Sequence, residues 1–192
     1  MSADRESNLF AKYTPRERSA PDVAAAAAAL SRELAIAPMT AADVNAVARL
    51  LAWREGISSQ VAGERAKDLL NRPHENVVLV ARLGPEVVGF GRAKFESRKP
   101  PPYEHVPQGW YLAGLIVDPA HRRRGIGLEL TRARLAWIAQ RAGEAYYFAN
   151  AANQATIDLH ARLGFQEIVR DFTFPRVTFS DGGVGVLFRV EL

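Results

Sequence analysis

The feature that most constrains this chain is an apolar stretch that runs directly into a turn rich in arginine and glycine. Trp110 to Val117 is apolar nearly throughout, which indicates a strand buried on both faces. The segment after Asp118 contains three consecutive arginines and two glycines, and a helical pattern follows from about Gly125 to Arg141. A buried strand that enters a helix through a tight turn is typical of a sheet with helices on its faces.

The remaining hydrophobic pattern extends this α/β (α+β) interpretation along the chain. Further strands are expected at 34–37, 77–81, 87–95, 145–149, 165–172 and 184–191, and further helices after Thr40, at 59–70 and at 153–163. The predicted order is β-α-α-β-β-β-α-β-α-β-β, a mixed central sheet flanked by helices. We expect one domain over residues 34–192. Residues 1–33 are polar and then alanine-rich, and are expected to form an N-terminal extension that is a short helix or partly disordered.

Composition excludes several classes of protein. The 192 residues include no cysteine, which excludes a disulfide scaffold, a thiolate zinc site, an iron–sulfur cluster and a cysteine nucleophile. No apolar run approaches the roughly 20 residues of a membrane helix. The N-terminal residues lack the basic and apolar regions of an export signal. We therefore expect a cytoplasmic protein with no bound metal and no membrane partner.

The turn between Asp118 and Gly127 has the properties of an anion site. Glycines let the backbone approach a ligand closely, and the first turn of a helix presents N–H groups without acceptors. The formal net charge is +4, and the arginine cluster adds positive charge beside the turn. A pyrophosphate fits such a site, although a tight turn with solvated arginines is the alternative. The Rossmann fingerprint fails because Leu130 occupies the place of its third glycine, and no Walker G-K-S/T sequence occurs.

Two blocks of residues together resemble one known family. Arg122-x-x-Gly125-x-Gly127 is similar to motif A of the GNAT N-acetyltransferase superfamily, Q/R-x-x-G-x-G/A. The helix that begins at Asn153 and ends before Gly164–Phe165 is similar to the family's N-x-x-A helix, which is closed by Gly-Phe. The two blocks occur in the family's order, and the predicted elements agree from residue 34 onward. The resemblance implies the GNAT fold over nearly all of the chain except the N-terminal extension.

The resemblance implies acetyl-CoA as co-substrate. In this family the amides of motif A hold the pyrophosphate, and the preceding strand pairs with the pantetheine arm. The residues that this implies for cofactor binding are Leu115, Ile116, Val117, Arg122, Arg123, Arg124, Gly125, Ile126, Gly127, Leu128 and Asn153. For Asn153, capping the helix that follows is the alternative role.

The reaction that the resemblance implies is direct acyl transfer from the thioester to an amine in a ternary complex. The family's usual thiolate acid is a tyrosine, but His160 occupies that position here. We expect His160 to protonate the departing thiolate, with a structural ring as the alternative. The predicted strand carries no carboxylate. Glu104, in the proline-rich loop before it, is therefore the candidate general base, with an ordinary loop residue as the alternative.

The expected acceptor is the primary amine of a small molecule, and aminoglycosides are one class that similar enzymes acetylate. Trp53, Glu55, Tyr103 and Tyr111 are the candidate acceptor-binding residues, although packing in the core is an alternative role for the aromatic ones. Two other functions remain open: acetylation of protein N-termini or lysines, and a non-catalytic acyl-CoA-binding regulator. Nucleic acid is not an expected partner, because no basic face with interleaved aromatic residues can be identified. A homodimer is left open.

Overall fold

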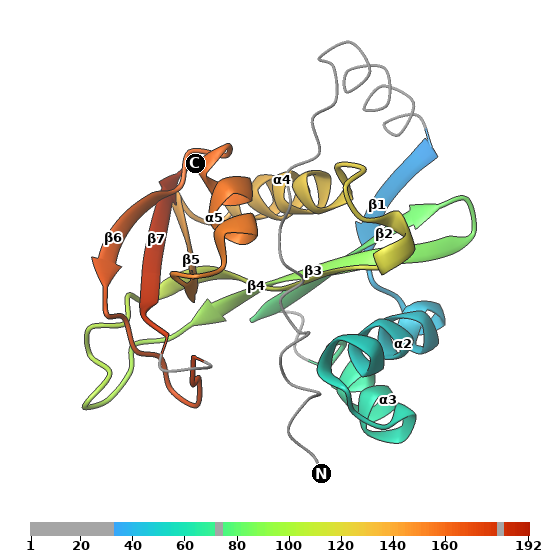
Figure 1. Cartoon of the computed structure of the whole chain (residues 1–192), viewed down its shortest axis with the longest axis horizontal. Coiled ribbons are helices and arrows are strands. Elements are labelled where there is room, and N and C mark those ends of the chain that lie inside the picture. The colour runs from blue at the N-terminus through green and yellow to red at the C-terminus, as the bar shows by residue number, and fades with distance from the viewer. Residues whose placement is uncertain (1–32, 72–74, 180–182) are drawn as a thin grey trace.

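The computed structural model describes residues 33–71, 75–179 and 183–192, so the predicted N-terminal extension lies almost wholly outside the described residues. Its centre is a seven-stranded sheet in the order β1-β2-β3-β4-β5-β7-β6 (Figure 1). The strands are β1 (Leu34–Pro38), β2 (Asn76–Leu83), β3 (Glu86–Glu96), β4 (Gly109–Val117), β5 (Glu144–Asn150), β6 (Gln166–Arg170) and β7 (Gly185–Glu191). The helices are α2 (Val44–Glu55), α3 (Ser59–Asp68), α4 (Ile126–Ala139) and α5 (Gln154–Ala161). The predicted order of elements is confirmed.

Helix ends follow the signals in the sequence. The backbone N–H of Thr40 donates to Asp43 Oδ2 at 2.8 Å, as expected of a capping box ahead of α2. Arg82 of β2 also binds Asp43 Oδ1 at 2.6 Å, so this cap ties the start of α2 to the sheet. Gly164 follows α5 with φ +85°, a left-handed conformation that suits glycine at a helix C-terminus.

The sheet is covered differently on its two faces. Helices α4 and α5 lie on one face, here called the α4 face, and α2 and α3 lie on the other, the α2 face (Figure 1). The core of the α4 face includes Val88, Leu130 and Phe188. On the α2 face the two helices pack over the β2–β4 half of the sheet, where Phe90 and Ile116 are buried. Each helix pair therefore seals one apolar layer against the sheet.

A separate aromatic cluster covers the other half of the α2 face. Tyr111 of β4 stacks on Tyr146 of β5 with ring centroids 5.2 Å apart, and Leu187 of β7 is buried with them. The proline-rich segment 97–108 and the segment after β6 close over this cluster. They contribute Val106 and Phe172 respectively, both almost fully buried. The α2 face thus carries two apolar clusters, one under the helices and one under these segments.

Strands β4 and β5 form the one parallel pair in the sheet, and their pairing is short. Tyr111 and Tyr146, both near the start of their strands, are the only Cα partners in this register among the described residues. Residues 113–117 of β4 therefore have no ladder partner on the β5 side. Helices α4 and α5 both begin after the carboxyl ends of these two strands. The unpaired end of β4 thus lies at the same edge as the two helix N-termini.

Leu130 anchors α4 to the sheet. Its side chain has no solvent exposure, and its Cδ1 lies 3.4 Å from the position of a Cβ built on Gly89 of β3. We expect Leu130→Ala to lower the free energy of unfolding by about 2–5 kcal/mol, through lost burial and the cavity it leaves. Urea denaturation followed by circular dichroism measures this. Arg132→Ala on the exposed side of α4 is the control and should change stability by less than about 0.5 kcal/mol. Equal effects of the two substitutions would contradict this packing.

Candidate active site

A β-bulge interrupts β4 just before its unpaired end. Phe90 of β3 pairs with Ile116 of β4, and Arg92 pairs with Ala113. Between these two pairs β4 contains two residues and β3 only one, so β4 carries one extra residue. The extra residue lies at Gly114–Leu115, and Gly114 has φ +56°. A glycine in the left-handed region is what such a bulge requires. The bulge locally bends β4, and Leu115 follows it directly.

A fully buried arginine supports this bulge from the α4 face. Arg134 of α4 is 1% exposed. Its Nη1 donates to the carbonyls of Arg92 at 3.1 Å and Ala113 at 3.4 Å, and its Nε donates to Leu130 O at 3.2 Å. No carboxylate pairs with it among the described residues, and burial lowers its pKa to about 9. The guanidinium thus satisfies one carbonyl on each strand, at the register pair where the bulge begins.

The turn after β4 exposes the predicted pyrophosphate site. Arg122, Arg123, Arg124 and Gly125 are all exposed. Arg123 has φ +62° and Gly125 has φ +90°, and the residue between them has a negative φ. Such alternation directs successive N–H groups to one side, which is the backbone form of an anion site. The first helical bonds of α4 run from Leu128 and Glu129 to Gly125 O, so the N–H groups of Ile126 and Gly127 precede them.

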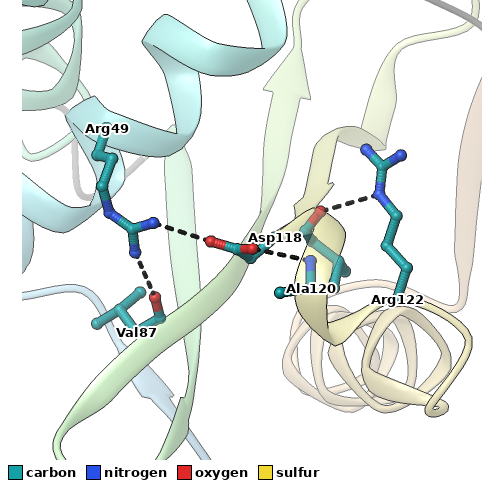
Figure 2. Close-up of polar contacts among 6 residues, drawn as sticks. Arg49, Val87, Asp118, Ala120 and Arg122 are labelled. Carbon is teal, nitrogen blue, oxygen red and sulfur yellow. Dashed lines mark hydrogen bonds and ion pairs between the residues drawn. The ribbon is translucent and has the colours of Figure 1, made fainter.

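Polar contacts hold the start of this turn against α2 (Figure 2). Asp118 Oδ2 accepts from Arg49 at 2.8 Å, and Asp118 Oδ1 accepts from the N–H of Ala120 at 3.0 Å. Arg122 Nε donates back to the carbonyl of Val117 at 3.2 Å. Burial raises the pKa of Asp118, but the hydrogen bonds from Arg49 and Ala120 outweigh this effect and lower the pKa. The carboxylate is therefore ionised at neutral pH and fixes the path of the chain out of β4.

Trp53, predicted to bind the acceptor, lies instead against a predicted cofactor residue. The guanidinium of Arg122 stands over its ring, 4.6 Å from the centroid. Trp53 is 48% exposed, so this contact is open to solvent. A cation over an indole ring is held by the ring's quadrupole. The position of Trp53 therefore fits a role in orienting Arg122, and binding of the acceptor by Trp53 stays a prediction.

Close packing joins the two sequence blocks that carry the family resemblance. A Cβ on Gly127 would lie 3.4 Å from Leu159 of α5 and 3.6 Å from Leu115 of β4. Gly127 of α4 therefore lies within van der Waals reach of both α5 and the unpaired end of β4. At the start of α5, Asn153 Oδ1 accepts from the N–H of Thr156 at 3.4 Å. Asn153 thus takes the capping role that the sequence left as an alternative, and cofactor contact stays a prediction.

His160 lies in the core rather than at a surface. It is 4% exposed and its ring stacks on Tyr147 of β5 with centroids 3.8 Å apart. Nδ1 donates to the carbonyl of Thr156 at 2.7 Å, and burial lowers the pKa to about 4. At neutral pH the ring is uncharged, so Nε2 has no proton to transfer. This geometry favours the structural alternative, and proton transfer from His160 stays an untested prediction.

The other predicted acceptor residues and the predicted general base, Glu104, have different surroundings. Tyr111 is buried, and its hydroxyl donates to Pro107 O at 2.8 Å, while Tyr103 packs partly buried in the same cluster. Glu104 is exposed in the segment that covers this cluster. Glu55, at the end of α2, forms an ion pair with Arg65 of α3. Tyr111 and Glu55 therefore have structural partners, and only Glu104 among these four extends freely to solvent.

The structure adds charged residues on the α2 face of β3 that we did not single out in the sequence. Arg92, Lys94 and Glu96 alternate along the strand, so their side chains share one face. Glu96 is 5% exposed and binds Lys94 at 2.7 Å and Lys99 at 2.5 Å. Burial raises the pKa of Glu96, but the two lysines outweigh this and lower it. The alternation of charged residues within an apolar strand was the signal that could have identified them.

Two further features are absent from the described part of the chain, a group of metal ligands and a membrane-spanning helix. No three histidine or acidic side chains there are grouped as metal ligands. None of its helices has the length and apolar character needed to cross a membrane.

The buried position of His160 predicts a specific pH dependence of stability. Its pKa falls from an ordinary 6.5 to about 4 on folding, so between these values the unfolded chain binds a proton that the folded chain does not. Stability is therefore lost as pH falls from 7 to 4, by about 3 kcal/mol from this residue. His160→Phe keeps a ring in the stack and should remove that part of the loss. Urea denaturation at pH 7 and pH 4 measures the difference, and identical losses in both proteins would contradict a buried neutral His160.

Comparisons with known proteins agree with this arrangement. The family model described as Acetyltransferase (GNAT) family matches residues 45–165. The N-alpha-acetyltransferase RimI of Mycobacterium tuberculosis is 34% identical over 112 residues, which cover 58% of this chain and 65% of RimI. A probable N-acetyltransferase of Arabidopsis thaliana, HLS1-like, is 41% identical over 59 residues, 30% of this chain. The match spans only 14% of that Arabidopsis protein. The chain therefore covers less than two thirds of the length of each of these two relatives.

A solved structure shares the fold over most of both chains. The structure of Arabidopsis thaliana NAA60 in complex with acetyl-CoA superposes with a TM-score of 0.64 at 20% identity, and covers 83% of this chain and 98% of that one. The family match includes the bulge of β4, the arginine-glycine turn and all of α5. This chain is therefore a member of the GNAT family of acetyltransferases.

Proposed function

We propose that this protein transfers the acetyl group of acetyl-CoA to the primary amine of a small molecule, directly and within a ternary complex. The observation that carries the proposal is the bulged, unpaired end of β4 leading into the exposed turn at Arg122–Gly127. An unpaired strand edge can pair with an extended amide-bearing arm, and the turn can bind the pyrophosphate at its end. The chain contains no cysteine that could carry the acetyl group from acetyl-CoA to the amine.

The cofactor assignment follows from these positions. Leu115, Ile116 and Val117 supply the strand edge for the pantetheine arm. The turn supplies amides and positive charge for the pyrophosphate, through Arg122, Arg123, Arg124, Gly125, Ile126, Gly127 and Leu128. Asn153, at the N-terminus of the neighbouring helix, lies at the same edge of the sheet. Acetyl-CoA is thus proposed to lie along β4 from the bulge to the start of α4.

The acceptor is proposed to approach from the α2 face. The α4 face is covered by helices α4 and α5 over an apolar core, whereas the α2 face carries the charged residues of β3 beside the bulge. The amine loses a proton, its nitrogen attacks the thioester carbonyl carbon, and the carbon–sulfur bond then breaks. A backbone N–H next to the bulge, at Leu115 or Ile116, stabilises the oxyanion that forms in between.

Two proton transfers complete the reaction. Glu104 is the proposed base for the amine, directly or through water, because it is exposed in the segment that covers the α2 face. Glu96 is the weaker candidate, since its two lysine partners lower its pKa and so its basicity. The departing thiolate takes its proton from solvent in this assignment, because His160 is neutral and buried.

A protein N-terminus is the second candidate acceptor. The similarity to RimI, a protein named as an N-alpha-acetyltransferase, favours it. Release of free thiol from acetyl-CoA, measured against small primary amines and against peptides with free N-termini, distinguishes the two candidates. Preference for the small amines supports the proposal, and preference for the peptides supports the second candidate. Absence of thiol release with every amine and peptide would contradict both.

Gly125→Ala tests the proposed pyrophosphate site. A side chain at φ +90° strains the turn and moves its N–H groups, so we expect affinity for acetyl-CoA to fall by about tenfold or more in calorimetry. Gly164→Ala is the matched control. It introduces the same backbone strain at φ +85°, but at the far end of α5. The control should lose stability and keep its affinity. Unchanged affinity in a folded Gly125→Ala protein would place the pyrophosphate elsewhere.

A further inference from the structure

Arg92 of β3 is a largely buried cation without a partner. Four side-chain atoms in the described residues are buried and lack a hydrogen bond, and Arg92 Nε is the one among them that belongs to a guanidinium. No ion pair to the Arg92 side chain occurs among these residues either, and burial lowers its pKa. Buried charges in proteins are normally paired or bind a ligand. The missing partner of Arg92 therefore indicates a bound anion.

The charges around Arg92 do not supply that anion. The acidic group whose charge acts on Arg92 is Glu96, which already binds both Lys94 and Lys99. Arg92, Lys94 and Lys99 together leave this group with two positive charges that Glu96 does not balance. Lys94 has a side-chain exposure of 38%, so the group reaches solvent. A negatively charged small molecule is attracted here, and a polycation is repelled.

Arg92 also lies beside the proposed site of acyl transfer. Its Cα is the register partner of Ala113, the residue directly before Gly114 in the bulge. Its side chain points to the α2 face, because Phe90, two residues earlier on the strand, packs there and Ala93 packs on the opposite face. This is the face from which the acceptor is proposed to approach. An anion bound by Arg92 would thus belong to the acceptor and lie close to its reacting amine.

We propose that Arg92 binds a carboxylate of the acceptor, and that the acceptor is a small molecule with its carboxylate near its primary amine, as in an α-amino acid. The proposal rests on the function proposed above and narrows its substrate class. A guanidinium binds a carboxylate through two parallel hydrogen bonds, which fixes the orientation of the ligand. Lys94 and Lys99 add attraction at longer range. Arg92 is thereby a specificity-determining residue for the acceptor.

The test uses pairs of substrates that differ only at the carboxylate. Each of a series of α-amino acids is compared with its own carboxamide, with kcat and KM measured by thiol release from acetyl-CoA. We expect kcat/KM to be about tenfold or more higher for the acid, because the carboxamide leaves Arg92 unpaired. The amine of the carboxamide is the less basic and so the more readily deprotonated at pH 7. A preference for the acid therefore reflects binding.

Substitution of Arg92 isolates its contribution. Arg92→Met should remove the preference by raising KM for the acid, while KM for the carboxamide and the affinity for acetyl-CoA stay nearly unchanged. Arg92→Lys should restore part of the preference, because it restores the charge without the two-bond geometry. Arg189→Met is the matched control. Arg189 lies on β7 and is paired with Glu144 and Glu191, so this substitution should keep the full preference.

The outcomes separate this proposal from the proposed function. Turnover of amines with equal rates for acid and carboxamide, or a preference that survives Arg92→Met, overturns the carboxylate site and leaves the acetyltransferase intact. Absence of turnover with every amine overturns the function. In that case calorimetry of the same pairs with the acetyl-CoA-bound protein still decides the site. Binding of the acid that is lost in Arg92→Met supports it, and equal binding of acid and carboxamide overturns it.

Discussion

The interaction on which the rest of the structure depends is the buried guanidinium of Arg134 under the bulge of β4. A bulge leaves carbonyl groups without regular ladder partners, and a buried carbonyl without a partner is costly. Arg134 donates to the carbonyls of Arg92 and Ala113, the register pair of β3 and β4 at which the bulge begins. A Cβ on Gly91 would lie 2.9 Å from Arg134 Nε, so the glycine in β3 makes room for this contact. Helix, strand and bulge are thus locked together at one point.

The bulge and the early end of the β4–β5 pairing give the two faces of the sheet different surroundings near the carboxyl end of β4. The carboxyl end of β4 is left with a free edge, and on the α4 face beside it Gly127 of α4 lies close to Leu159 of α5. The α2 face stays partly polar between its two apolar clusters, with Arg92, Lys94 and Glu96 on β3. A cofactor that follows the edge and an acceptor that comes from the α2 face can therefore meet at the bulge without sharing a path.

At the candidate site, some features could be predicted from the sequence and others could not. The turn at Arg122–Gly127 was identified because glycine, arginine and a helix start form a local pattern, and its geometry follows from neighbouring residues. The function of His160 depends on burial instead. Its ring lies against Tyr147, which is 13 residues away in the chain, and that contact lowers its exposure and its pKa. Tyr111 and Trp53 likewise owe their surroundings to residues distant in the chain. Tyr111 stacks on Tyr146, and Trp53 lies under the guanidinium of Arg122.

The sequence by itself determined the order of the strands and helices, the ends of the helices at Thr40 and Gly164, and the turn that follows β4. These depend on periodicity, capping and backbone freedom, which are properties of short segments. The tertiary structure alone decided that the β4–β5 pairing stops at Tyr111 and Tyr146, that Arg134 lies fully buried under the bulge, and that Arg92 Nε is buried without a hydrogen-bond partner among the described residues. These depend on which distant residues come together. A charged residue has the same identity in a sequence whether it is solvated or buried, and only packing sets its surroundings.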